Sequence, residues 1–195
     1  MTFSRIYRNN EWGNPESRSG SGSTLEATKN IRAALPELLA NLQIACVLDI
    51  PCGDFNWQKE LDWDGTRYIG ADIVPELIEA NRAAYPERDF RVLDLARDEL
   101  PQADLVICRD CLVHLSFEDC FKALENICKS GAKYLLTTTF PLHRNEEDIQ
   151  TGEGWRPVNL CEEPFPLGDP ALMLNEGCVE PFYWDKCAAL WRIEN

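Results

Sequence analysis

The sequence has no long hydrophobic run. No apolar stretch approaches the roughly 20 residues needed to cross a bilayer, so we expect no membrane span. The first ten residues carry Arg5 and Arg8 with no apolar core behind them, which argues against a secretory signal peptide. We therefore expect a cytoplasmic protein.

Basic residues are scarce. Nineteen lysines and arginines stand against 33 acidic residues, which gives a net charge of -14 at pH 7, and no Lys/Arg cluster occurs. A surface this negative repels phosphate backbones and anionic membranes, so neither nucleic acid nor a membrane is an expected partner. These features do not indicate an oligomeric state.

Several binding motifs are also missing. The sequence has neither the G-x-G-x-x-G of nicotinamide and flavin enzymes nor the Gly-Lys-Ser/Thr of a phosphate-binding loop. Cys108 and Cys111 form one C-x-x-C, but no second pair or nearby His completes a zinc site, so no metal is expected. Of the nine cysteines, Cys46, Cys108, Cys128 and Cys187 lie in apolar patterns, which favours buried, reduced thiols.

The sequence does contain an apolar run at residues 44–49 that leads directly into Pro51 and Gly53. This order predicts a strand buried on both faces, then a tight turn, then a helix that starts at Asp54. In an open α/β sheet such a turn lies at the carboxyl edge, where ligands bind against bare backbone.

Strands and helices alternate after this turn, at a spacing typical of βαβ units. The pattern predicts strands at residues 67–72, 90–93, 103–108 and 133–139, and helices at residues 55–61, 75–85 and 116–130. Residues 171–175 and 187–193 are joined by a turn too short for a parallel crossover, so we expect an antiparallel hairpin at the sheet edge. Residues 1–195 are thus predicted to form one α/β domain with a single doubly wound, mostly parallel sheet.

Two segments fall outside this alternation and are candidate covers of the carboxyl edge. Residues 1–24 are either a disordered tail or a glycine-hinged flap, and Ser23 with Glu26 predicts a capping box that opens a helix at Thr24. Residues 140–170 are rich in proline, glycine and acids and show no helical periodicity. A structureless connection of this length is either functional or a sign of a wrong assignment.

Four consecutive strands are predicted to end in an acid: Asp49, Asp72, Asp94 and, one residue later, Asp110. Because the carboxyl ends of parallel strands share one edge, these acids concentrate negative charge there, which suits a ligand with positive charge and hydroxyls. Asp72 lies 19 residues after Gly53, the spacing at which an acid at the second strand meets ribose hydroxyls.

Taken in order, five segments resemble the motifs of the class I S-adenosylmethionine-dependent methyltransferases. They are residues 49–54, 69–73, 93–95, 108–115 and 135–141. Pro51 stands where glycine is commoner in the first motif. The resemblance covers residues 44–141 and implies a Rossmann-like methyltransferase fold, with S-adenosylmethionine as the cofactor.

The resemblance also implies which residues surround the cofactor. They are Asp49, Pro51, Cys52, Gly53, Asp72, Ile73, Asp94 and Leu95. Asp72 would hold the ribose hydroxyls and Asp94 the adenine amino group, with Leu95 against the ring.

The methionine part of the donor would lie against the turn at residues 51–53, and Asp49 would orient that turn or the ammonium group. The donor's carboxylate needs a cation or N–H donors. Arg18 and Arg109 are the two candidate cations.

Asp110 and His114 are the expected catalytic pair. They are four residues apart, and we expect them on one helical face, with the carboxylate orienting the imidazole as a general base. The alternative is that His114 is a packing residue hydrogen-bonded under the cofactor. An acceptor that is already a carboxylate or thiolate needs no base.

The residues expected around the methyl acceptor are Trp57, Phe140, His143, Trp155 and Arg156. His143 is a second candidate base. Trp155 and Arg156, with Asn159, form a cluster able to grip a carboxylate or a sugar-like acceptor. Trp155 could instead anchor the loop to the sheet, and Trp57 could pack the first helix.

The predicted function is methyl transfer to an O or N atom of a small polar molecule by direct displacement. The pocket is expected to be small because no substrate domain is inserted. Three alternatives stay open: a methyltransferase of protein or RNA, an inactive S-adenosylmethionine-binding module, and a nucleotide-dependent oxidoreductase. The missing glycine fingerprint disfavours the last of these.

Overall fold

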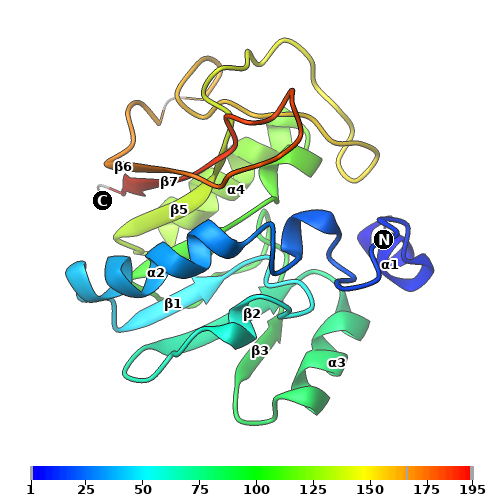
Figure 1. Ribbon diagram of the computed structural model, residues 1–195, viewed down its shortest axis with the longest axis vertical. Coiled ribbons are helices and arrows are strands. Elements are labelled where there is room, and N and C mark those ends of the chain that lie inside the picture. Colours follow the sequence, from blue (N-terminus) through cyan, green and yellow to red (C-terminus); the bar gives the residue numbers. More distant parts are fainter. Residues whose placement is uncertain (1, 166, 194–195) are drawn as a thin grey trace.

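The computed structural model describes residues 2–165 and 167–193. Its strands form one seven-stranded sheet in the order β3-β2-β1-β4-β5-β7-β6 (Figure 1). They are β1 (Cys46–Asp49), β2 (Arg67–Asp72), β3 (Asp89–Val92), β4 (Leu105–Cys108), β5 (Tyr134–Thr139), β6 (Leu172–Asn175) and β7 (Cys187–Arg192). β1 to β5 pair in parallel, and β7 lies antiparallel between β5 and β6. The predicted α/β fold with a C-terminal antiparallel hairpin is confirmed.

Four α-helices accompany the sheet: α1 (Thr2–Asn9), α2 (Lys29–Asn41), α3 (Pro75–Ala84) and α4 (Phe117–Lys129). α3 and α4 begin where the sequence predicts. Pro75 opens the first turn of α3, and the Ser116 hydroxyl accepts a hydrogen bond from the Asp119 amide at 3.2 Å. None of the helices in the described ranges is long and apolar enough to cross a membrane.

Two helix predictions are wrong. The helix expected at residues 55–61 is only a 3-10 turn at Gln58–Glu60, because Phe55 has φ 57°, which a right-handed helix excludes. The capping box at Ser23 does not form either. Ser21–Ser23 is a 3-10 turn of its own, and α2 begins five residues after Thr24.

The central strands divide the core into two layers. Val47 and Ile107 pack with α2 and α3, whereas Leu48 and Val106 pack with α4, because successive strand residues point to opposite faces. In Figure 1, α2 crosses in front of the sheet and α4 lies behind it.

The long loop (residues 140–170) holds no helix or strand in its described part, as predicted. It nevertheless closes the layer on the α4 face, because Val158, Leu160 and Phe165 are buried in the same core as α4. Asn145 fastens the loop to itself: its Nδ2 donates to the Asn159 carbonyl oxygen at 2.8 Å, and its Oδ1 accepts from the Asn159 amide at 3.0 Å. The loop is therefore an ordered part of the fold.

The cysteines are only partly in the core. Cys108 and Cys187 are buried, but Cys46 is half-buried and Cys128 is exposed on α4. The prediction of buried thiols is thus wrong for Cys128, which lies on the solvent side of its helix.

Candidate active site

The turn after β1 lies at the carboxyl edge of the parallel strands. The Cys52 amide donates to the Ala71 carbonyl oxygen at 2.7 Å, so the turn stays fastened to β2. Gly53 has φ 55°, and a Cβ at this position would collide with the Ser19 side chain. Glycine is needed here because both the left-handed backbone and the neighbouring segment exclude a side chain.

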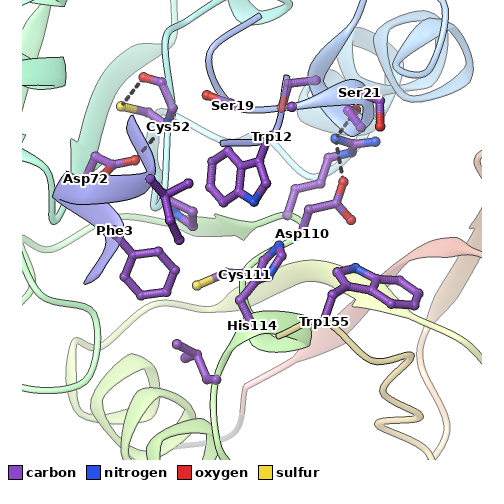
Figure 2. A pocket seen from close by; sticks show the side chains of 18 of the residues that line it. Phe3, Trp12, Ser19, Ser21, Cys52, Asp72, Asp110, Cys111, His114 and Trp155 are labelled. Carbon is purple, nitrogen blue, oxygen red and sulfur yellow. Dashed lines mark hydrogen bonds and ion pairs between the residues drawn. The ribbon is translucent and has the colours of Figure 1, made fainter. Parts of the chain in front are cut away.

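A cavity of about 970 Å³ opens beside this turn (Figure 2). Sites for small molecules usually measure roughly 300–1,000 Å³, so this cavity is larger than predicted and has room for two small ligands. Most of the predicted site residues line it: Pro51, Cys52, Gly53, Trp57, Asp72, Ile73, Asp94, Leu95, Arg109, Asp110, His114, Phe140 and Trp155.

Two of the strand-end acids face the cavity from β2 and β3. Asp72 is buried, and its carboxylate accepts from the amides of Gly53 at 3.3 Å and Val74 at 3.0 Å. Burial raises the pKa of Asp72 to about 6, although these amides oppose the shift. Asp94 accepts from the Ala96 amide at 2.9 Å and pairs with Arg97 at 2.7 Å.

Asp49 lies beneath the turn and outside the cavity. Its Oδ2 accepts from the Tyr68 hydroxyl and from Gln58 Nε2, both at 2.7 Å. Burial raises the pKa of Asp49 to about 7, against the effect of these two donors. Gln58 Nε2 also donates to the Cys52 carbonyl oxygen at 2.9 Å, so Asp49 braces the turn from below.

Arg109 lines the cavity, but its guanidinium is already occupied. It makes a bidentate pair with Glu176 at 2.8 Å, donates to the Gly22 carbonyl oxygen at 2.8 Å and lies 3.1 Å from Asp110. Lys186 completes the network, 2.7 Å from Asp110 and 3.1 Å from Glu176. Two cations and two anions thus balance each other, and the network ties β4 to the loop between β6 and β7.

Asp110 and His114 both line the cavity, but they do not share a helical face. Asp110 has φ 52°, and residues 112–114 form only a 3-10 turn. Although burial alone would raise the pKa of Asp110, Arg109 and Lys186 hold it well below its usual range. Asp110 therefore stays ionised and is a poor general base.

His114 has the features that a base needs. Its Nδ1 lies 2.9 Å from the Gly154 carbonyl oxygen, which can only accept, so Nδ1 carries the proton and Nε2 is the free acceptor. Burial lowers the pKa of His114, while Asp110 opposes that shift, so the neutral imidazole is favoured. Trp12 packs against the imidazole at 5.6 Å between ring centroids.

The N-terminal cover (residues 2–24) closes one side of the cavity, which supports the flap over the disordered tail. Asp54 holds it: its carboxylate accepts from the Ser17 hydroxyl at 2.9 Å and the Arg18 amide at 2.6 Å. Glu16 Oε1 accepts from Asn56 Nδ2 at 2.8 Å, on the same turn. In Figure 2, Asp72 and Cys52 lie on one side of Trp12, and Asp110 and Trp155 on the other.

The helix α1 lies within the predicted cover, but no helix was predicted there. Phe3, Ile6 and Tyr7 of α1 line the cavity, and their i, i+3, i+4 spacing was the signal for it. Trp12, which lies within the predicted flap, also lines the cavity, as do Tyr183 and Lys186, which were not predicted. Tyr183 and Lys186 come from the hairpin loop (residues 176–186), and no local pattern marks them.

The chain is similar to known methyltransferases in sequence and in fold. A family model described as "Methyltransferase domain" matches residues 24–167, about three quarters of the chain. The chain belongs to this methyltransferase family. The predicted membership of a methyltransferase family is thereby confirmed. A similar curated protein, "Putative methyltransferase 235L" of Invertebrate iridescent virus 6, is 34% identical over 107 residues. The match covers 50% of this chain and 40% of the viral protein.

Solved structures of methyltransferases share the fold of this chain. The N-methyltransferase NodS from Bradyrhizobium japonicum WM9, in complex with S-adenosylhomocysteine, has a TM-score of 0.68 at 16% identity, over 97% of this chain and 99% of NodS. Human N-acetylserotonin methyltransferase, in complex with S-adenosylmethionine, has a TM-score of 0.63 at 18% identity. That alignment covers all of this chain and 59% of the human enzyme. The Rossmann-like methyltransferase fold is therefore confirmed.

Four residues predicted for the methyltransferase site lie elsewhere. Asp49 is beneath the turn, and Arg18 is exposed, with its guanidinium 3.4 Å from the Tyr7 carbonyl oxygen. His143 Nδ1 lies 3.2 Å from the buried Asp185. Arg156 lies over the Phe117 ring at 4.5 Å and donates to the long loop, which turns it away from the cavity.

Proposed function

We propose that the methyltransferase binds its donor along the edge formed by the ends of β1 to β4 and transfers a methyl group to an O or N atom of a small polar molecule. S-adenosylmethionine, the donor implied by the sequence, is supported by the two neighbours that carry it or its product. One observation carries the proposal. The buried Asp72 and the acceptor nitrogen of His114 face one cavity, which is large enough for donor and acceptor together.

Different turns of the donor edge (residues 49–54, 72–74, 93–97 and 109–111) would bind different parts of the donor. Asp72 takes the ribose hydroxyls and Asp94 with Leu95 takes the adenine, since all three line the cavity at the ends of neighbouring strands. The bare backbone at Gly53 leaves room for the methionine part.

The donor's carboxylate is better served by backbone than by an arginine. Arg18 is outside the cavity, and the guanidinium of Arg109 is saturated by Glu176, Gly22 and Asp110. Ser21 and Gly22 of the cover line the cavity, and their N–H groups would bind the carboxylate, since hydrogen bonds from N–H groups to an anion are strong.

When bound, S-adenosylmethionine supplies an electrophilic methyl group on a sulfonium centre. The protein's part is to align the acceptor and to exclude water, and alignment of this kind is worth roughly 7–11 kcal/mol. The N-terminal cover and the long loop would limit access of water to the bound ligands, because Trp12 and Trp155 line the cavity from these two segments. His114 Nε2 takes the proton of an acceptor that must lose one.

Two measurements test this function. In thermal shift, S-adenosylhomocysteine at 100 times its dissociation constant stabilises a true binder by about 2.7 kcal/mol, whereas NAD should give no shift. Labelled methyl from S-adenosylmethionine should enter a small-metabolite extract and not total RNA or protein. Binding without any labelled product would identify an inactive module instead, and transfer to RNA or protein would replace the proposed acceptor class.

A further inference from the structure

We propose that the acceptor is a flat aromatic compound whose ring hydroxyl is methylated, with its ring held by the aromatic side chains that line the same cavity as His114. This inference rests on the function proposed above and narrows its acceptor class.

The aromatic side chains come from separate parts of the chain. Trp155 of the long loop and Tyr183 of the hairpin loop meet edge to face at 4.7 Å. Phe140, at the end of β5, contacts both of them, at 5.6 Å and 6.0 Å. Trp12 of the N-terminal cover lies against His114. All of these residues line the cavity, so ring surface surrounds the place where the acceptor must lie.

Trp155 is not explained by core packing alone. It is 39% exposed, and it lines the cavity together with Val179, which is 91% exposed. A large ring held half-covered beside an opening offers an aromatic ligand a face to stack on. An aliphatic ligand cannot stack on this face and would gain less binding energy from it.

The charges around the cavity disfavour an anionic acceptor. Among the described residues, each lysine or arginine that lines the cavity is already paired: Arg97 with Asp94, Arg109 with Glu176, and Lys186 with Asp110 and Glu176. A carboxylate or phosphate on the acceptor would have to displace one of these partners.

The grip that the sequence suggested for a carboxylate or a sugar is also absent from the cavity. Arg156 is turned away, and Asn159 Nδ2 donates to the carbonyl oxygens of Pro141 at 3.1 Å and His143 at 2.9 Å. Of that cluster, Trp155 alone faces the cavity. What remains of the predicted acceptor site is therefore aromatic.

The base also selects the hydroxyl. A phenolic hydroxyl has a pKa near 10, as in tyrosine, whereas an aliphatic hydroxyl is far less acidic. Neutral His114 can take a phenolic proton as the bond to carbon forms. In the step, the oxygen of the phenolic hydroxyl forms a bond to the methyl carbon, and the bond between that carbon and the donor's sulfur breaks with its electron pair left on sulfur. The hydroxyl proton passes to His114 Nε2 and then to water.

A panel of acceptors tests the proposal. The full-length protein is incubated with labelled S-adenosylmethionine and either phenol, catechol or 5-hydroxyindole, or with cyclohexanol, glycerol, glycine or succinate. Phenol and cyclohexanol form the sharpest pair, because they share ring size and differ in flatness and acidity. We expect label in the aromatic hydroxyl compounds and none in the aliphatic ones.

Three variants test whether the aromatic acceptor binds against Trp155. Trp155→Ala should raise KM for the aromatic acceptor about tenfold, because a ring contact is lost, and Trp155→Phe should restore most of it. The matched control is Trp184→Ala, which removes an exposed tryptophan that does not line the cavity. The dissociation constant of S-adenosylhomocysteine, measured by calorimetry, should stay the same in all three.

The outcomes separate the two proposals. If S-adenosylhomocysteine binds but the label enters only aliphatic compounds, or no aromatic one, the aromatic acceptor is wrong and the donor site stands. An unchanged KM in Trp155→Ala would also overturn the ring contact. If S-adenosylhomocysteine does not bind at all, the proposed function fails and this inference falls with it.

Discussion

The donor edge and the segments that cover it are built in different ways. Each turn of the donor edge follows its own strand within a few residues, so local sequence determines both its position and its chemistry. The segments that cover it are attached to it by pairs of residues far apart in the chain, such as Ser17 with Asp54 and Arg109 with Glu176. Donor recognition can therefore be read from short motifs, whereas acceptor recognition depends on how distant segments meet.

His114 lies where these two regions join, and its removal should have the largest effect. We expect His114→Gln to lower kcat by roughly 100-fold or more, within the range for a lost general base, with donor affinity nearly unchanged. His143→Gln is the matched control, because that histidine contacts Asp185 outside the cavity. Equal rates in the two variants would leave His114 with a packing role only.

The pH profile of the same step has a definite sign. Burial lowers the pKa of His114 from its ordinary value of 6.5, and a base must be unprotonated to act. We therefore expect kcat/KM to rise with pH through a midpoint below 6.5 and then to level off. Asp110, which also bears on His114, stays ionised across this window, because its pKa lies well below its usual range. A midpoint above 7 in steady-state kinetics would contradict the buried, neutral imidazole.

Asp72→Ala tests the donor edge by itself. The variant should lose about 3 kcal/mol of donor binding, roughly 100-fold in affinity, because hydrogen bonds to a charged group are each worth about 1.5–3 kcal/mol. Calorimetry with S-adenosylhomocysteine measures the loss, and circular dichroism checks that the fold is intact. Asp72→Asn keeps the acceptor oxygen for one turn amide and serves as the comparison. Unchanged binding in Asp72→Ala would remove Asp72 from the ribose role.

Asp54→Ala tests the cover and should have a smaller effect. The variant frees the Ser17 hydroxyl and the Arg18 amide, so the N-terminal cover should loosen while the strand ends stay in place. We expect donor affinity to fall about tenfold, or about 1.4 kcal/mol, and hydrogen exchange to speed up in residues 12–24. Glu37→Ala on the exposed side of α2 is the control. If exchange is unchanged, the cover is held by something other than Asp54.

The last prediction concerns the stability of the fold and not its activity, through Asp49 beneath the turn. The pKa of Asp49 is raised from 3.8 to about 7, so between these values the folded state holds a proton that the unfolded state has released. Stability therefore falls as pH rises through this window, by about 1.4 kcal/mol per pH unit from this group. Asp49→Asn should remove that slope, measured as free energies of unfolding in urea at pH 5, 6 and 7. Parallel slopes in parent and variant would show that Asp49 is not buried as an acid.

Features set by local sequence could be predicted, whereas features that depend on contacts between distant segments could not. Strand ends, Pro75 at the start of α3 and the Ser116 cap are local signals, and each was found from the sequence. The failed helix at residues 55–61 depends on the positive φ of Phe55, which no composition rule marks. Asp49 was predicted to contact the donor because it is an acid at a strand end. Its hydrogen bonds to Tyr68 and Gln58 hold it beneath the turn instead. A local pattern could not say that.

In the long loop, some of the residues predicted for the acceptor site line the cavity and others do not. Phe140 and Trp155 were expected at the acceptor and line the cavity, whereas Arg156, next in the chain, contacts Phe117 outside it. In a loop without a repeat, neighbouring side chains point in unrelated directions, so residue type alone does not tell which one faces a ligand.

The two coverings differ in what must be broken before they can move. The long loop is embedded through Val158, Leu160 and Phe165, so lifting it would expose part of the hydrophobic interior to water. In the N-terminal cover, α1 packs Phe3 against the core, but residues 16–18 are held by polar contacts to Asp54 and Asn56, which water can replace at little cost. Product exchange should then occur on that side. The pace of turnover would be set by the release of a polar latch and not by any loosening of the core.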